Sequence, residues 1–426
     1  MGAVTDGAMS FVPLQTRTGT FAGEYLRALP DRDVVIWGAG VLGRCLMRQL
    51  RAFALPGQRF FFTDSNPALY ETRIDDQPVL DLELAMRQAH AGHALLVTAV
   101  AGHLKEHAAR LVAAGLRADE DFVSYLGLSR PEAVIQVSTR HGDTVDAMPL
   151  DTCQAVLAKL KADIPDLFHV DLSGWGEPLD NPCLADIIRA TGAIAPCTVT
   201  TRLLADKPAI EQALRAAPMQ FVVTVDGFDT SYHTNTPDGN WEIFVERLRF
   251  VSEMQRQMVG KTEIRLRYNV FRNNDGADFD AMRALCGELG IRMVKAIGYI
   301  DPYDTTLRLC ETGAVDDPAS PQPRRLAWSL REALVWARVD RERPCLCQRI
   351  FPVIHSDGSV GICHLYAQPR LHARYMAVDF EALQRLRLAA DHCRVCQRYA
   401  LHRLDVDVLQ SRHAIHLIPP PETTHA

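Results

Sequence analysis

The sequence predicts an α/β protein of several domains, in which strands and helices alternate to build parallel sheets. At 426 residues, the chain is longer than one hydrophobic core normally fills, so two or three domains are expected. Over most of its length, short apolar segments alternate with amphipathic segments of helical period. This alternation is typical of parallel sheets whose faces are covered by helices.

The composition is that of a globular protein without a strongly charged surface, with 47% hydrophobic residues, 23% charged residues and a net charge of -6. A weakly acidic chain gives no support to binding of nucleic acid or of an anionic membrane. No apolar run approaches the roughly 20 residues of a membrane helix. The first residues lack the basic flank and apolar stretch of a secretory signal. We therefore expect a cytoplasmic protein with neither a nucleic-acid nor a membrane partner.

Changes of pattern along the chain predict its domain boundaries. The stretch ETGAVDDPASPQPRR is rich in Pro, Asp and Ala without periodicity, which is typical of a linker. The predicted segments are a tail with a lead-in helix (1–30), a first βα unit (31–130), a second βα series (131–312), a linker with a helix (313–340), a cysteine-bearing module (341–410) and a loose tail (411–426).

The first unit begins with a strand, a glycine turn and a helix. Gly38-x-Gly40-x-x-Gly43 follows the strand VVIW, and Asp64 ends the next strand, 21 residues after Gly43. This is the context of a dinucleotide fingerprint, in which the helix N-terminus holds phosphate and the acid holds ribose. The unit is therefore predicted to be a Rossmann-like domain. Because it is about half of a dinucleotide-binding fold, two interpretations stay open: binding of NAD(P) or a nucleotide sugar, or a scaffold in which the glycines serve packing.

The second series contains strands and helices in strict alternation, so its six predicted strands and five helices favour an open barrel or a sheet, too small for a closed eight-fold barrel. The strands are predicted at 133–139, 167–173, 196–202, 220–226, 262–270 and 291–300, and the helices start near Leu150, Pro182, Pro208, Trp241 and Asp278.

The eleven cysteines fall into two groups. Six lie singly in predicted helices and strands and are interpreted as buried small hydrophobes: Cys45, Cys153, Cys183, Cys197, Cys286 and Cys310. The other five lie between residues 345 and 396, several in close pairs. In a reducing compartment such clustering suggests a metal site.

The clustered cysteines come together if the segment FPVIHSDGSVGI forms a hairpin. The hairpin would bring Cys347 and Cys363 side by side, and Cys393-x-x-Cys396 would add two thiolates from one tight turn. Cys345 could substitute for one of them or cap the site. Four thiolates suit either a zinc ion that staples a small domain or an iron–sulfur cluster, and both stay open.

The pattern Cys347-x10-Gly358-x4-Cys363, followed by Cys393-x-x-Cys396, resembles the SPASM or "twitch" extension of radical S-adenosylmethionine enzymes. In that family such cysteines hold an auxiliary 4Fe-4S cluster. No further cysteines follow the last pair, so the resemblance is to a version with one cluster.

The central series resembles the same family more strongly. HVDLSGWGEPLDNPCL is similar to the family's turn after the second strand, which binds the amino group of S-adenosylmethionine. The resemblance assigns this role to four residues: Gly174, Gly176, Glu177 and Pro178. Later strand ends also resemble the family, at Thr200, Thr201, Asp226 and Asn269. The resemblance implies a partial (β/α)6 barrel of radical S-adenosylmethionine type.

One departure from the family decides the expected chemistry. Family members carry Cys-x-x-x-Cys-x-x-Cys after the first strand, whereas the loop from His141 to Ala147 holds no cysteine here. Without that triplet there is no reductive cleavage of S-adenosylmethionine by the family's route. Three polar residues of this loop are interpreted as solvated: His141, Asp143 and Asp146.

Three functional hypotheses follow. The first is a degenerate homologue from a biosynthetic or maturation pathway, which keeps one auxiliary 4Fe-4S cluster and binds a peptide, a small molecule or a partner enzyme. The second is an active radical enzyme that modifies a peptide, a sugar or a small metabolite. The third is a nucleotide-dependent oxidoreductase, or a binding protein stapled by zinc. Enzymatic activity stays open because the residues for S-adenosylmethionine cleavage are absent.

Overall fold

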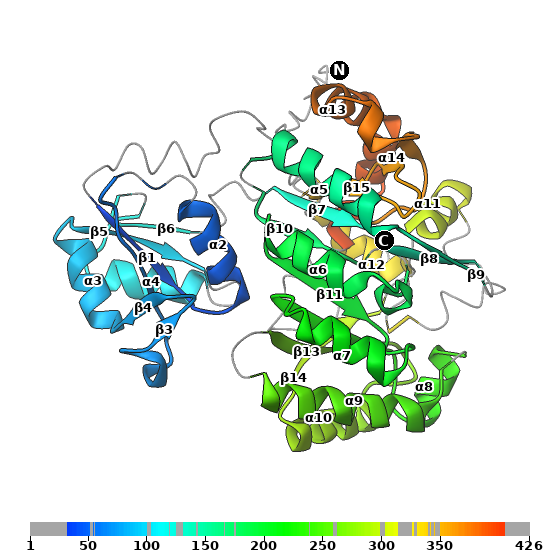
Figure 1. Cartoon of the computed structure of the whole chain (residues 1–426), viewed down its shortest axis with the longest axis horizontal. Coiled ribbons are helices and arrows are strands. Elements are labelled where there is room, and N and C mark those ends of the chain that lie inside the picture. Colours follow the sequence, from blue (N-terminus) through cyan, green and yellow to red (C-terminus); the bar gives the residue numbers. More distant parts are fainter. Residues whose placement is uncertain are drawn as a thin grey trace, which may run out of the picture.

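The computed structural model describes most of the chain between residues 32 and 404, and its elements form two large sheets and a small hairpin (Figure 1). The mixed α/β architecture with parallel sheets is as predicted. The described residues are 32–51, 54, 56–99, 104–118, 120–124, 131–141, 144–165, 167–173, 176–237, 239–258, 262–298, 303–313, 326–327, 330–339, 341, 345 and 350–404.

The N-terminal unit is a mostly parallel sheet with the strand order β3-β4-β2-β1-β5-β6. Its central strand is buried on both faces, since Val34 and Ile36 pack toward one side and Val35 and Trp37 toward the other. This explains the continuous apolar run of the strand. The elements are β1 (Asp33–Trp37), α2 (Val41–Arg51), β2 (Phe60–Thr63), β3 (Arg73–Ile74), β4 (Gln77–Leu80), α3 (Leu82–His90), β5 (Ala94–Thr98), α4 (Leu104–Ala113) and β6 (Phe122–Ser124).

The central sheet has the order β14-β13-β12-β11-β10-β7-β15-β16-β17, and the six strands from β14 to β7 are parallel. Each predicted strand of this series is present, and helix α8 was not predicted. The strands are β7 (Glu132–Ile135), β10 (His169–Asp171), β11 (Cys197–Thr201), β12 (Gln220–Val225), β13 (Glu263–Val270) and β14 (Arg292–Ile297). The helices are α5 (Leu150–Asp163), α6 (Leu184–Gly192), α7 (Lys207–Arg215), α8 (Thr230–Asn235), α9 (Trp241–Gln257) and α10 (Ala277–Leu289).

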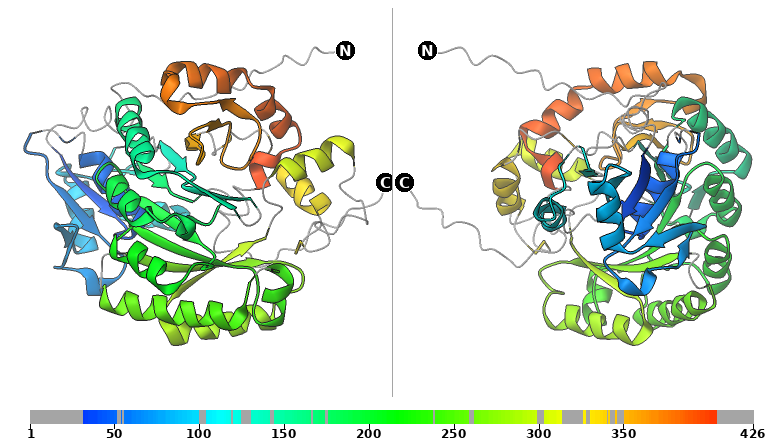
Figure 2. Two further views of the ribbon diagram at one scale, coloured as in Figure 1. Left: turned by 45° about the vertical axis from the view of Figure 1, so that its right-hand side comes forward. Right: turned by 90° about the vertical axis from the view of Figure 1, so that its left-hand side faces the viewer.

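The two faces of the central sheet differ in polarity. Along β13, Leu266 and Tyr268 are fully buried in the core that the helices share, whereas Arg267 and Asn269 on the opposite face are half-buried. Helices cover one side of this sheet in Figure 2. The uncovered face is therefore polar, as an apolar surface there would remain in contact with water.

The C-terminal module extends the central sheet. The predicted hairpin is present, and its first strand, β15, pairs in parallel with β7. Helices α11 and α12 share one apolar core with the cysteine-bearing segment. The elements are α11 (Tyr303–Thr312), α12 (Leu330–Val339), β15 (Ile350–Ile354), β16 (Val360–Gly361), β17 (Arg370–His372), α13 (Phe380–Ala389) and α14 (Asp391–Arg398).

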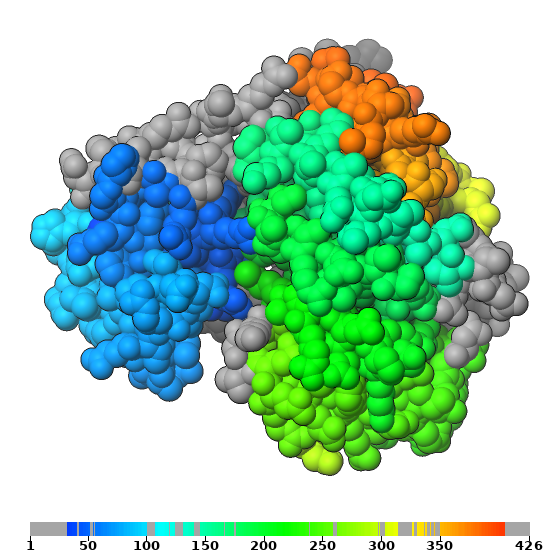
Figure 3. Space-filling model, viewed as in Figure 1, coloured from blue at the N-terminus to red at the C-terminus, as the bar shows by residue number. Residues whose placement is uncertain are grey.

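The N-terminal unit packs against the central sheet through α2 (Figures 1 and 3). Arg48 on α2 donates a hydrogen bond to the carbonyl oxygen of Gly192 at 2.9 Å. Phe168 and Met219, from segments that precede β10 and β12, pack in the apolar cluster of the N-terminal unit. The contact therefore lies at the amino ends of these strands. In the part of the chain that the structure describes, no helix has the length and apolarity required to cross a membrane.

Candidate functional site

Four cysteines from distant segments line one small cavity in the C-terminal module. Cys345 precedes β15, Cys363 follows β16, and Cys393 and Cys396 lie on α14. Cys363 is only 8% exposed, and Cys396 is only 7% exposed. Three of the four predicted ligands therefore come together. The fourth, Cys347, lies outside the described residues.

The Cys-x-x-Cys pair lies on a helix, which corrects the predicted tight turn. Residues three and four apart face the same side of a helix. Cys393 lies three residues before Cys396 and His392 lies four residues before it, so both share a face of α14 with Cys396. Helical periodicity therefore directs both thiols toward the same side of the helix.

Burial dominates the chemistry of these thiols. Burial raises the pKa of Cys393 to about 11, with a further contribution from Cys363 and Cys345. Burial also raises the pKa of Cys396 well above its usual value. Without a cation the thiols stay protonated at neutral pH, whereas a bound metal cation stabilises the thiolate form.

The donor set fits a thiophilic metal, but the thiols are not in coordinating positions. Among the described residues, no three His, Cys, Asp or Glu side chains form a group that would hold a metal ion. The cavity between the cysteines measures about 20 Å³, which is room for about one water molecule. Either metal requires the side chains to shift, and a four-iron cluster requires the larger shift because it has the larger volume.

The strand-end turn after β10 packs closely on Ser138, three residues beyond the end of β7. A Cβ atom on Gly176 would lie 1.9 Å from the carbonyl oxygen of Ser138, so only glycine fits there. The Ser138 hydroxyl donates to the carbonyl oxygen of Glu177 at 2.7 Å. Pro178 is buried and begins a short 3-10 turn, and Gly174 lies outside the described residues.

The carboxylate of Glu177 is already bound by donors of the protein. It accepts hydrogen bonds from the Thr201 hydroxyl at 2.6 Å, from the Arg202 amide at 2.8 Å and from the Leu179 amide at 3.3 Å. The residue is 2% exposed, and burial raises its pKa in opposition to these hydrogen bonds. Glu177 therefore ties the turn to the end of β11. Its role toward an amino group of a ligand stays a prediction from resemblance.

Polar side chains continue along the strand ends next to this turn. Asp226 accepts a hydrogen bond from the Asn269 amide nitrogen at 2.7 Å, and the Thr200 amide donates to the Ser173 hydroxyl at 2.8 Å. Burial raises the pKa of Asp226, and Arg267 opposes that shift. The Arg267 Nε atom is buried without a hydrogen-bond partner among the described residues. Arg267 was not predicted as a site residue, because an arginine that alternates with apolar residues on a strand is ordinarily solvent-facing.

A β-hairpin follows β7, at the place where the sequence resemblance calls for a cysteine triplet. Strands β8 (Ser138–His141) and β9 (Thr144–Ala147) pair in antiparallel register, with Thr139 opposite Asp146. The segment that was predicted as a solvated loop is therefore largely a strand. Asp146 is exposed, as expected, whereas the His141 side chain and Asp143 lie outside the described residues.

In the N-terminal glycine turn, Gly43 packs closely against the backbone of Gly38. A Cβ on Gly43 would lie 1.8 Å from the Gly38 carbonyl oxygen, whereas a Cβ on Gly40 would meet no atom within 4 Å. Asp64 lies beside the turn, where its Oδ2 accepts a hydrogen bond from the Ala39 amide at 2.9 Å. The predicted residues are therefore together, and one carboxylate oxygen of Asp64 is used by the turn itself.

The single cysteines behave as expected. In the structure Cys45, Cys153, Cys197, Cys286 and Cys310 are buried, and Cys183 is half-buried.

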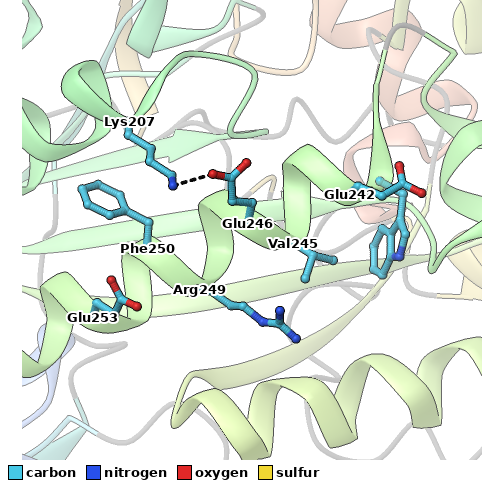
Figure 4. A pocket seen from close by; sticks show the side chains of 8 residues that line it. Lys207, Glu242, Val245, Glu246, Arg249, Phe250 and Glu253 are labelled. Atoms are coloured by element: carbon cyan, nitrogen blue, oxygen red, sulfur yellow. Dashed lines mark hydrogen bonds and ion pairs between the residues drawn. The ribbon is translucent and has the colours of Figure 1, made fainter.

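A groove lies outside the sheet, between α7 and α9, and measures about 440 Å³ (Figure 4). Lys207 and Glu246 form an ion pair across it. Its other charged side chains are Glu242, Arg249 and Glu253, so both signs are present. The groove is separate from both the strand ends and the cysteines, and it carries no arrangement of catalytic groups.

Comparison with solved structures finds similar chains at low identity. SuiB of Streptococcus suis bound to precursor peptide SuiA is 17% identical, with a TM-score of 0.40 over 66% of this chain and 68% of that chain. SuiB bound to S-adenosylmethionine is 16% identical, with a TM-score of 0.39 over 70% and 73%. Native anSMEcpe with bound AdoMet and Kp18Cys peptide is 15% identical, with a TM-score of 0.40 over 64% and 88%.

No family model matches the sequence, and no curated protein matches it. Similarities with TM-scores of 0.39 and 0.40 assign neither a family nor an activity to this chain.

Proposed function

We propose that this chain is a degenerate member of the radical S-adenosylmethionine family that holds one auxiliary 4Fe-4S cluster and acts as a binding or partner subunit. The observation that carries the proposal is the cavity lined by Cys345, Cys363, Cys393 and Cys396. Soft thiolates from three separate segments are the donor set that iron–sulfur clusters use. A bound cluster would supply electron transfer or rigidity to the module.

The hairpin after β7 supports the degenerate character. Its backbone is paired along both strands, and its sequence contains no cysteine. A cluster that cleaves S-adenosylmethionine needs three thiolates on one loop and one iron left open. Residues 138–147 contain no cysteine, which supports the proposal that this chain does not start radical chemistry by the family's route.

Analysis of iron, labile sulfide and zinc in anaerobically purified protein tests this function. We expect about four irons per chain, the content of one cubane cluster, and loss of that iron in Cys393→Ala. Cys286→Ala serves as the matched control, because Cys286 is buried in the helix-covered core away from the module. Eight irons would reveal a second cluster and contradict the proposal, and a single zinc would make the module a structural staple.

A retained binding site at the strand ends is part of the proposed function. Asp226, Asn269 and Arg267 present carboxylate, amide and guanidinium groups on the uncovered face of the sheet. Such groups suit a polar ligand that carries both positive and negative charge. The sequence resemblance suggests that this ligand is S-adenosylmethionine. Titration calorimetry with S-adenosylmethionine should give saturable binding that Asp226→Ala weakens. Formation of 5'-deoxyadenosine with dithionite would instead support an active radical enzyme that modifies a peptide, a sugar or a small metabolite.

The glycine turn favours nucleotide binding as a second candidate function. Gly40 is exposed and open, so a phosphate can approach the start of α2 there. Fluorescence titration with NADH or NADPH tests the corresponding oxidoreductase. We expect Gly40→Ala to weaken binding without unfolding the unit, because its Cβ meets no neighbouring atom of the protein but takes up the space that the phosphate would approach. No response of the unaltered protein would remove this candidate.

A further inference from the structure

The polar face of the central sheet carries a guanidinium that the described part of the chain leaves unpaired. The Arg267 Nε atom is buried and has no hydrogen-bond partner among the described residues. Arg265, two residues earlier on the same face of β13, differs in this respect, since its guanidinium pairs with the Glu263 carboxylate. Natural proteins rarely leave a buried donor unpaired, so the Nε atom of Arg267 points to an acceptor that a ligand supplies.

The strands on either side of β13 place no acid next to this guanidinium. In the parallel register, Arg267 lies between Thr224 on β12 and Val294 on β14. The Thr224 hydroxyl is itself used as a donor, to the Thr201 carbonyl oxygen at 3.3 Å. A half-buried cation between these two side chains loses hydration without gaining a counter-charge. An anion that binds there would supply the missing charge.

The surrounding strand ends carry more positive than negative charge. Burial raises the pKa of Asp226, directly after β12, and the guanidinium charges of Arg267 and Arg202 oppose that rise. Arg202 directly follows β11 and is exposed. Within the described part of the chain, neither guanidinium forms an ion pair. Even when ionised, Asp226 therefore balances only one of the two cations, although the whole chain has a net charge of -6.

We propose that Arg267 binds a carboxylate group of the ligand at the strand ends, and that this ligand is an organic acid with net negative charge. A guanidinium presents its Nε–H and one Nη–H side by side, which matches the two oxygens of a carboxylate. Arg202 adds a second positive charge. The ligand is therefore distinct from S-adenosylmethionine, in which two positive charges exceed one carboxylate. The inference rests on the proposed function, because it takes the strand ends as a retained binding site.

Titration calorimetry of the full chain with three probes tests the inference. The probes are glutarate, its uncharged diamide and an acidic tetrapeptide, so that a carboxylate is offered as a free acid and as part of a peptide. We expect saturable binding of at least one acid and no binding of the diamide. The acid that binds more tightly identifies the source of the carboxylate.

Arg267→Gln should weaken binding of that acid about tenfold, which is the effect of losing one charge-assisted hydrogen bond. Arg267→Lys keeps the charge but not the paired donors, so it should recover only part of the affinity. Circular dichroism shows that each variant is folded before it is titrated.

Arg265→Gln is the matched control. It removes the same charge from the same face of the same strand, but Arg265 is already paired with Glu263. This variant should bind the acid as tightly as the unaltered protein does. An equal loss of affinity in Arg265→Gln and Arg267→Gln would indicate an unspecific effect of net charge and would overturn the inference.

Three further results would also overturn it. They are binding of neither acid, unchanged affinity in Arg267→Gln, and tighter binding of inorganic phosphate than of either acid. Failure of the proposed function is distinguishable from these outcomes, because iron content and S-adenosylmethionine binding are measured in the absence of the acids.

Discussion

At the scale of single residues, Gly176 shows how closely the strand-end turn packs on the chain that follows β7. The turn approaches the backbone of Ser138, and the hydroxyl of Ser138 holds the next residue of the turn. This glycine was predicted as a site residue because its turn resembles a ligand-binding turn. The structure adds a reason that requires no ligand, since any side chain at this position would overlap the neighbouring strand.

We predict that Gly176→Ala lowers the free energy of unfolding by about 2 kcal/mol, a typical cost of overpacking. Urea denaturation measures the change. Gly287→Ala is the control, because a Cβ there meets no atom within 4 Å and alanine is the better helix former by about 1 kcal/mol. Equal stability of Gly176→Ala and the unaltered protein would contradict the close approach.

His355 is a second residue whose environment the tertiary structure sets. It is 1% exposed and directly follows β15, and its Nδ1 lies 2.8 Å from the side-chain oxygen of Gln136, which directly follows β7. An amide oxygen only accepts, so Nδ1 donates. Burial lowers the pKa of His355 from 6.5 to about 4, with a further decrease from Arg370 and an opposing effect of Asp357.

This shift predicts a pH dependence of stability. The imidazole takes up a proton below pH 6.5 in the unfolded chain but only below about 4 in the folded one. The contribution of neutral His355 to the free energy of unfolding is therefore complete above pH 6.5. It is lost as the pH falls from 6.5 to about 4, and the total loss is about 3 kcal/mol. Denaturation measured across this pH range should show a free energy of unfolding that falls less steeply in His355→Asn than in the unaltered protein, because asparagine keeps a donor but does not titrate. Identical slopes would contradict the prediction.

At the scale of elements, α14 and the segment before β15 decide which thiols meet. The helix directs Cys393 and Cys396 to one side by its periodicity. The hairpin of β15 and β16 then brings Cys363 to the same cavity, which Cys345 also lines. Sequence spacing favoured Cys347 as the fourth ligand, because it matches the family pattern.

The structure predicts that Cys345 contributes to metal binding. Cys345→Ala should lower the iron or zinc content of the purified protein to below half, because loss of one of four ligands leaves an incomplete shell. Metal analysis of Cys345→Ala and Cys347→Ala side by side measures the effect. If Cys345→Ala keeps its full metal content and Cys347→Ala loses it, Cys347 and not Cys345 is the ligand.

At the scale of the whole molecule, the N-terminal unit and the central sheet share an apolar contact. Phe168 is 4% exposed and packs in the same cluster as Leu46 and Leu50 of α2. Arg48 adds a hydrogen bond to Gly192 at its edge. The glycine turn and the strand ends of the central sheet therefore belong to units in direct contact, and movement of one unit is restrained by the other.

We predict that Phe168→Ala destabilises the protein by about 3 kcal/mol and loosens this contact. Limited proteolysis should then cut between the two units faster than in the unaltered protein. Phe244→Ala is the control, because Phe244 is equally buried but lies in the core of the central sheet. The same cleavage pattern in both variants would show that Phe168 acts only on global stability.

The predicted alternation of strands and helices is confirmed because each element carries its own periodicity. Apolar runs such as 33–37 and alternating runs such as 263–270 read as strands before any partner is known. The strands of the central series are present where expected, and the helices begin at or near the predicted residues. The 138–147 hairpin was missed because its polar sequence has the composition of a loop.

The sequence by itself determined the order of the elements, the parallel sheets and the grouping of cysteines, since these depend on local pattern and spacing. Only the tertiary structure decided that β15 pairs with β7, that Cys345 lines the cavity, and that the Glu177 carboxylate is bound by Thr201 and Arg202. The physical reason is that these contacts join residues far apart in the chain. Their distances depend on how the sheets and helices pack, and no local periodicity records that packing.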